Sequence, residues 1–129
     1  MPRRTKAIEL LDFEIPFYER LLTNYPDFVD VLVPLGEAYS RRGFLQKGLE
    51  VDLKLTQLRE SDPIMWYNLA CSYSLLNRVD DAANALRQAI ALGYDDPNHL
   101  KNDPDLINLR RSAAYRELLD LVVQQRQTA

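Results

Sequence analysis

The sequence predicts an all-α fold: a helical solenoid of antiparallel helix pairs, closed by a helical C-terminal cap. The first observation is a repeat at a spacing of 34 residues, in which Asp62-Pro63 returns as Asp96-Pro97. A period of this length is typical of solenoids, whose units bury their apolar faces by stacking on neighbours. The second observation is the composition. The 129 residues include 22 leucines and only 4 glycines, a balance that favours helices.

Composition also limits the classes of partner. The net charge of −3 argues against nucleic acid, because phosphate binding needs a clustered basic surface. The nearest such cluster is Arg3, Arg4 and Lys6, which we interpret as a frayed terminal arm. We expect no membrane span, because no run of about 18 apolar residues occurs. The single cysteine, Cys71, cannot form an intramolecular disulfide, so a cytoplasmic location is expected.

Residues 1–129 are predicted to form a single domain of four segments, the first two of which are residues 1–28 and 29–62. The first segment reads as a helix or half-repeat from Ile8 to Asn24, which Pro16 is expected to bend or restart. The second is the first full repeat. An amphipathic helix is expected from residue 27 to 42, Gly43 to end it in the left-handed conformation, and a second helix to follow over residues 44–60.

The third segment, residues 63–96, is the second repeat, and residues 97–129 form the cap. Asp62 is a good N-cap and Pro63 a good first helical residue. Asn77 should end that helix, and Gly93 the next. In the cap, short helices are expected on either side of Asp103-Pro104, followed by a final helix capped by Ser112. Loops this short favour antiparallel neighbours.

These residues resemble the tetratricopeptide repeat, whose pattern is Trp-x2-Leu-Gly-x2-Tyr and later Ala-x3-Phe. The second repeat reads Trp66-x2-Leu69-Ala70-x2-Tyr73, and the first departs from the pattern most clearly at Asp52. Residues 92–110, called here the closing segment, resemble the end of some bacterial repeat proteins. The resemblance implies a right-handed superhelix that binds other proteins.

The resemblance also implies where a partner binds, because the first helix of each repeat lines a concave groove in this family. The groove positions carried over are Val33, Glu37, Ser40, Arg41, Tyr67, Asn68, Cys71, Ser74 and Leu75. Spacing agrees, since these residues lie partly away from the apolar stripe of each helix. Two alternatives stay open: the C-terminal helix folds back over these positions, or they are ordinary solvated residues.

Other chemistry is not expected. Trp66 and Cys71 are interpreted as packing residues, and His99 as a local hydrogen-bonding partner of the aspartates near it. No catalytic constellation or phosphate-binding loop is present, so we expect no cofactor, no metal and no enzymatic activity. The predicted function is a non-enzymatic, adaptor-like or co-chaperone-like module that binds a peptide or helix of a partner protein. The alternative is a homo-oligomerisation module that uses the groove or an exposed solenoid end.

Overall fold

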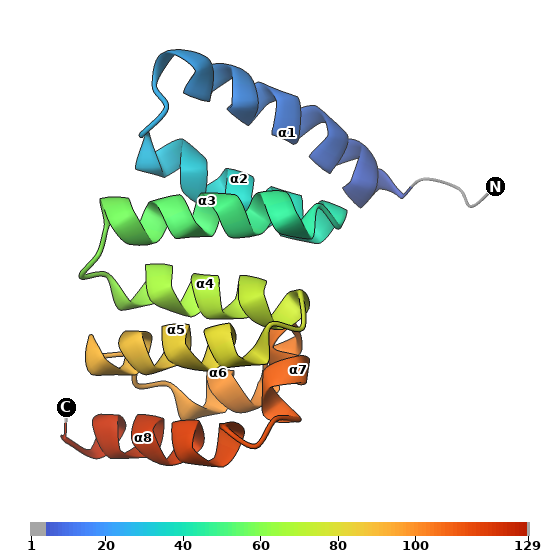
Figure 1. The fold of residues 1–129 in the computed structure, drawn as a ribbon. Helices are drawn as coiled ribbons and strands as arrows, with labels where there is room; N and C mark the ends of the chain where they lie inside the picture. Colours follow the sequence, from blue (N-terminus) through green and yellow to red (C-terminus); the bar gives the residue numbers. More distant parts are fainter. Residues whose placement is uncertain (1–4, 129) are drawn as a thin grey trace. The chain divides into compact units, whose positions relative to one another are not determined.

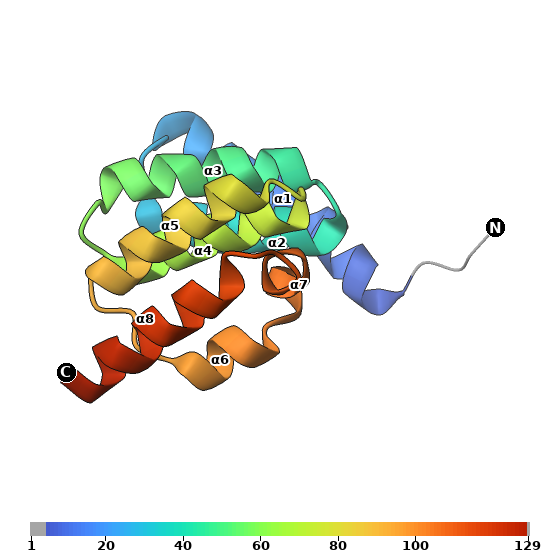
Figure 2. The ribbon, with the colours of Figure 1, turned by 60° about the horizontal axis from the view of Figure 1, so that its bottom comes forward.

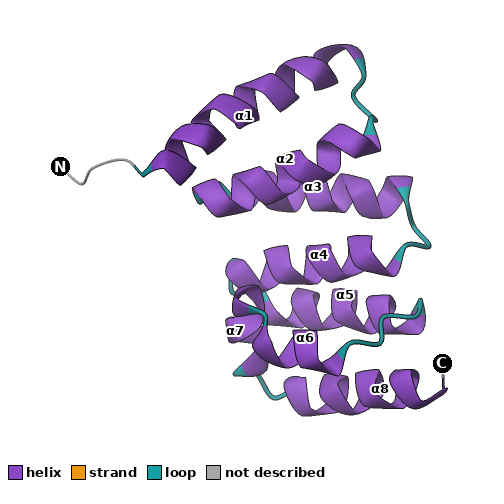
Figure 3. Cartoon of the chain, turned by 180° about the vertical axis from the view of Figure 1, so that it is seen from behind, coloured by secondary structure: helices purple, strands orange, loops and turns teal. Residues whose placement is uncertain are grey.

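The computed structural model describes residues 5–128, and within them every regular element is helical (Figures 1 and 3). The all-α class is therefore confirmed. The chain divides into two compact units, residues 1–58 and 59–129, which we call the first and second unit and describe separately. The predicted basic arm at Arg3 and Arg4 lies outside the described residues. No described helix is both long enough and apolar enough to cross a membrane.

The first unit contains α1 (Lys6–Asn24), α2 (Val29–Arg42) and α3 (Leu45–Leu58), and α2 packs against both of its neighbours. Its core lies between α1 and α2. The buried members of this core are Leu11, Ile15, Leu35, Ala38 and Tyr39. Burial of such large side chains contributes about 1.5–3 kcal/mol each, which makes the α1–α2 contact a main source of stability in this unit.

Pro16 was expected to bend or restart the N-terminal helix, and the helix does not restart there. α1 is a single helix of 19 residues with Pro16 inside it. Residues before and after the proline, such as Leu11 and Leu22, pack against the same core. This shared burial explains why the helix continues, although proline removes one backbone hydrogen bond at a cost of about 3 kcal/mol.

The turn between α2 and α3 follows the prediction. Gly43 adopts φ 89°, in the left-handed region that favours glycine, and ends α2. Beyond the turn, the two helices approach closely at Gly36 and Gly48. A Cβ atom added at Gly48 would lie 2.9 Å from the Oγ atom of Ser40. Small residues at this crossing therefore set how closely α2 and α3 pack.

The second unit contains α4 (Pro63–Leu75), α5 (Val79–Ala91), α6 (Pro97–Asn102), the 3-10 turn η1 (Pro104–Leu106), α7 (Ile107–Arg110) and α8 (Tyr115–Thr128). α4 and α5 form the most extensive helix pair, and α8 packs against α5 and α6 (Figure 2). η1 and α7 also pack against α4. The closing segment thus belongs to the core of this unit.

Local capping in the second unit mostly follows the prediction. The Asp62 carboxylate accepts a hydrogen bond from the Ile64 backbone N–H at 2.9 Å, and Asp96 caps α6 in a similar way. Asn77 ends α4 with φ 58°. The prediction for Ser112 was wrong, because its hydroxyl donates to the Leu109 carbonyl and α8 begins three residues later at Tyr115.

Candidate binding surface

The nine predicted groove residues divide into four on α2 and five on α4, and the structure places the two groups in different surroundings. On α4, Tyr67, Cys71 and Ser74 are buried, with exposed fractions of 5%, 8% and 0%. Asn68 and Leu75 are half-buried. The expectation that Tyr67, Cys71 and Ser74 lie open in a groove is therefore wrong for this structure, because the closing segment covers them.

A hydrogen-bonded cluster around Asp103 holds the closing segment on α4. The Tyr67 hydroxyl donates to Oδ2 of Asp103 at 2.6 Å, and the Cys71 thiol approaches the same oxygen at 3.8 Å. The imidazole of His99 lies 3.3 Å from this oxygen, as the expected local partner. The other carboxylate oxygen accepts the Asp105 backbone N–H at 2.9 Å. A buried face of α4 and the start of η1 thus share one carboxylate.

Ser74 provides a second attachment point for the closing segment. Its hydroxyl accepts a hydrogen bond from the Leu109 backbone N–H at 3.2 Å, and its carbonyl accepts one from the Asn108 side chain at 2.8 Å. Within the closing segment, the Arg110 side chain donates hydrogen bonds to the backbone carbonyls of Leu100 and Asp103. These bonds satisfy backbone groups that burial would otherwise leave unpaired.

Aromatic rings pack around this cluster, and burial there raises the pKa of two tyrosines. The Tyr67 ring stacks on Tyr94 at 4.7 Å between ring centroids and contacts His99 at 5.2 Å. Burial raises the pKa of Tyr67 far above its ordinary value, and the nearby Cys71 and Asp103 raise it further. Burial likewise raises the pKa of Tyr94. Both hydroxyls therefore stay protonated well into the alkaline range, and Tyr67 acts as a donor to Asp103.

The same cluster contains potential metal-ligand atoms. Cys71, Asp103 and Asp105 offer one atom each within 4.8 Å of one another. In this structure, however, the Asp103 carboxylate already accepts hydrogen bonds from the Tyr67 hydroxyl and from the backbone of Asp105. The observed geometry is accounted for by attachment of the closing segment to α4.

Of the alternatives considered for the groove, the structure shows self-covering on α4, but by a different element. The final helix, α8, packs on α5 and α6, whereas η1 and α7 pack on α4. Trp66, expected in the core, is only half-buried, and its indole N–H donates to the Glu60 carbonyl at 2.8 Å. On α4, the aromatic side chain that is buried is that of Tyr67, which stacks on the buried Tyr94.

On α2, the predicted groove positions remain partly open. The Glu37 and Arg41 side chains are each 69% exposed and form an ion pair of 3.6 Å. Both line a shallow cleft of about 160 Å³ between α1 and α2, together with Glu14 and Tyr18. Val33 and Ser40 are half-buried. The structure therefore leaves charged side chains accessible on this face of the first unit.

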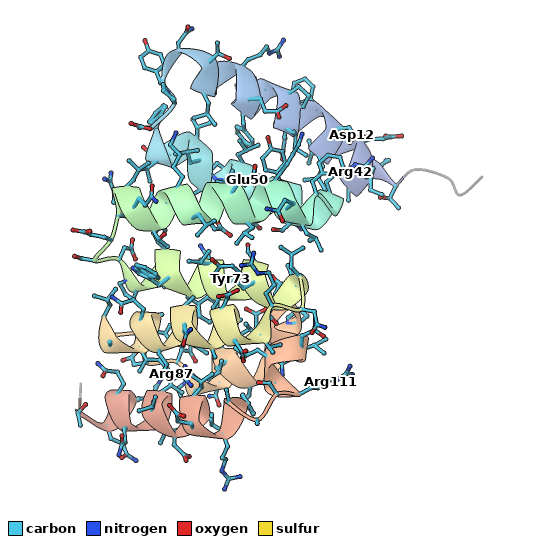
Figure 4. The ribbon with its side chains drawn as sticks, in the orientation of Figure 1. Asp12, Arg42, Glu50, Tyr73, Arg87 and Arg111 are labelled. Carbon is cyan, nitrogen blue, oxygen red and sulfur yellow. The ribbon has the colours of Figure 1, made fainter. Side chains whose placement is uncertain are left out.

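Polar contacts join α1 and α2, the two helices that flank this cleft. Arg42 and Asp12, which point toward each other in Figure 4, form an ion pair of 2.7 Å, with side chains 26% and 28% exposed. The Tyr39 hydroxyl donates to Glu19 at 2.6 Å. Burial and Glu19 together raise the pKa of Tyr39 above its ordinary value. Side-chain contacts between α1 and α2 thus fix the two helices that flank the cleft.

Sequence reasoning missed two features of these surfaces. Asp103 was interpreted as a helix break before Pro104 and as a neighbour of His99, and its contact with Tyr67 on α4 was not foreseen. The second feature is on α1. Four large apolar side chains recur there at steps of three and four residues and remain exposed; they are Leu10, Phe13, Phe17 and Leu21. Their spacing is readable from the sequence as a second stripe.

Comparison with known proteins gives a partial relationship. No protein-family model matches the chain. An alignment 87 positions long, which covers 65% of the chain, shows 36% identity to a chloroplastic protein of Arabidopsis thaliana. The match covers 26% of that protein, so this chain spans about a quarter of its relative's length. The relative's name refers to the chloroplast, and the cytoplasmic location of this chain stays a prediction.

Proposed function

We propose that this protein is a non-enzymatic, adaptor-like interaction module that binds a segment of a partner protein on the α2 face of its first unit. We further propose that its helix pairs follow the tetratricopeptide arrangement, as a right-handed solenoid. The proposal uses an internal comparison. The 34-residue period relates Glu37 and Arg41 on α2 to Cys71 and Leu75 on α4.

The observation that carries the proposal is the occupant of the α4 face. There, a segment from elsewhere in the chain lies on the first helix of the pair, with a tyrosine, a serine and a carboxylate making its main contacts. The α4 face thus has the size and chemistry to hold a short helical segment. The corresponding positions on α2 keep their charged side chains exposed.

The chemistry of the α2 face indicates the kind of segment that would fit. Glu37 and Arg41 present opposite charges one helical turn apart, beside the half-buried Val33. A partner segment with an apolar residue at one end, then a basic and then an acidic residue, would match the order of these side chains along α2. Apolar contact would supply affinity, and the charges would set the direction of the segment.

The test exchanges the two charges. A variant with Glu37→Arg and Arg41→Glu keeps the net charge and the ion pair within α2, and so preserves the fold. A photo-crosslinker at position 33 would first identify a partner, and its affinity would then be measured with purified proteins. We expect the exchange to weaken binding by about tenfold or more, because it reverses the charge pattern that the partner meets.

A matched exchange provides the control. Arg116 and Asp120 are exposed one turn apart on α8, in the second unit. Exchanging them should leave the affinity unchanged. If the exchange at positions 37 and 41 has no more effect than this control, the α2 face is not the binding surface and the proposal is wrong.

A further inference from the structure

α1 carries two apolar stripes, and only one of them is used inside the first unit. The inner stripe packs on α2 and consists of Leu11, Ile15, Tyr18 and Leu22. The outer stripe consists of Leu10, Phe13, Phe17 and Leu21, with exposed fractions of 55%, 66%, 42% and 38%. Its side chains recur at steps of three and four residues, so they lie on one face of the helix. The rings of Phe13 and Phe17 stack with their centroids 6.5 Å apart.

Two more exposed aromatic side chains follow in the loop after α1. Tyr25 and Phe28 are exposed there by 66% and 46%. They line a hollow of about 550 Å³ with the intervening residues. With about 200 Å² for a whole large apolar residue, the exposed fractions of the four stripe residues amount to roughly 400 Å². An exposed apolar patch of this size is often functional in a monomer.

We propose that the outer stripe is the contact surface between two copies of this chain, whose α1 helices pair in antiparallel orientation. The occupant is indicated by the charges beside the stripe. Glu9 and Arg20 are both exposed, and about three helical turns separate them, so they lie on the same flank. Neither forms an ion pair with another described residue.

The orientation follows from these two charges. When a second α1 lies antiparallel about a two-fold axis, the same flanks of the two helices meet with their ends reversed. Glu9 of each copy then faces Arg20 of the other, which gives two equivalent ion pairs. A parallel pair would instead bring Glu9 of one copy beside the opposite flank of the other, where Glu14 lies. Two like charges would meet there, so antiparallel pairing is favoured.

The size of the surface indicates the class of dimer. Pairing of the two stripes would bury up to roughly 800 Å², which is below the range for stable protein interfaces and within that of weak complexes. A concentration-dependent dimer is therefore expected rather than an obligate one. The acidic flank residues Glu9 and Glu14 also disfavour insertion of this stripe into an anionic lipid surface.

The test measures the dimer dissociation constant of the full chain by sedimentation equilibrium over a wide range of concentrations. Phe13→Asp should weaken the dimer by about a hundredfold, because it places two charges in the centre of the apolar contact. The control is Ile64→Asp, which introduces the same charge at an apolar side chain that is 50% exposed outside the stripe. It should leave the dissociation constant unchanged. Circular dichroism would verify that both variants remain helical.

Charge exchange tests the orientation. Glu9→Arg and Arg20→Glu should each weaken the dimer by about threefold to tenfold, and the double variant should restore the wild-type value. A chain that is monomeric at every concentration would overturn the proposal, as would a dimer that Phe13→Asp leaves intact. Failure of the double variant to restore affinity would overturn the antiparallel pairing.

Two further outcomes separate other occupants of the stripe. Sedimentation with vesicles containing phosphatidylserine that depends on Phe13, in a chain that does not dimerise, would assign the stripe to a lipid surface and overturn the proposal. The exchange at Glu37 and Arg41 changes side chains of α2 and none of the outer stripe, so it should leave the dimer unchanged. A failure of the proposed partner-binding function is therefore distinguishable from a failure of this proposal.

Discussion

Replacement of Tyr67 by phenylalanine tests how the closing segment is held on α4. The change removes only the hydroxyl that donates to Asp103 at 2.6 Å, while the ring can still stack on Tyr94. A hydrogen bond to a charged acceptor contributes about 1.5–3 kcal/mol. The Asp103 side chain is 11% exposed and retains its bond from the Asp105 backbone, so its carboxylate is partly compensated. We expect a loss of about 2 kcal/mol in the free energy of unfolding.

Urea unfolding monitored by circular dichroism measures this loss, and hydrogen exchange locates it. Amides of residues 92–110 should exchange faster in the variant, because the closing segment opens before α4 and α5 separate. Tyr73→Phe is the matched control on the same helix. The Tyr73 ring contacts Arg78, and its hydroxyl makes no hydrogen bond with another described residue. Its removal should cost less than about 0.5 kcal/mol.

A double-mutant cycle isolates the interaction itself. Asp103→Asn removes the charge from the acceptor, and in that background Tyr67→Phe should cost less than in the wild type, with a coupling of about 1 kcal/mol or more. The reasoning is refuted if Tyr67→Phe is as stable as Tyr73→Phe. It is also refuted if the loss in Tyr67→Phe is the same with and without the Asp103 carboxylate.

Three other changes test the remaining structural statements. Ser74→Ala should lower the free energy of unfolding by about 1–3 kcal/mol in urea titration, because the buried Leu109 N–H loses its acceptor; an unchanged value would show that this bond does not contribute. Gly43→Ala should cost about 1 kcal/mol in thermal unfolding, because alanine is strained at φ 89°, whereas equal or higher stability would contradict the assigned turn. Stability should also fall as pH rises above about 10, by up to about 1.4 kcal/mol per pH unit for each tyrosine whose pKa is raised in the folded state, since the unfolded chain releases these protons and the folded chain retains them. The tyrosines are Tyr39, Tyr67 and Tyr94, and a flat profile of stability in urea unfolding from about pH 9 to about pH 11 would exclude this linkage.

Much of the secondary structure was predictable because its signals are local. Asp62 and Pro63 begin α4 through a side-chain cap and a residue that needs no backbone hydrogen bond. Gly43 ends α2 through its left-handed conformation. Such effects depend on a few neighbouring residues, so they can be read from the sequence without knowledge of the fold.

Pro16 shows where local reasoning stops. Its cost to the helix is a local property, but the burial that outweighs this cost comes from α2, on which both halves of α1 pack. Asp103 is a similar case. Its position before Pro104 indicated the end of a helix. Its hydrogen bond with Tyr67, however, joins residues 36 positions apart. The spacing of residues within α4 or within the closing segment does not predict that these two side chains meet.

The candidate surfaces show the same difference between what residue spacing predicts and what the fold decides. The spacing of residues in the sequence determined that α1, α2 and α4 each present more than one usable face, and composition set their chemical character. Only the tertiary structure decided which faces are covered. The closing segment buries Tyr67 and Ser74 on α4, while Phe13 on α1 and Glu37 on α2 stay exposed. The physical reason is that helical periodicity is a property of one segment, whereas burial depends on which distant segment satisfies its apolar and polar groups.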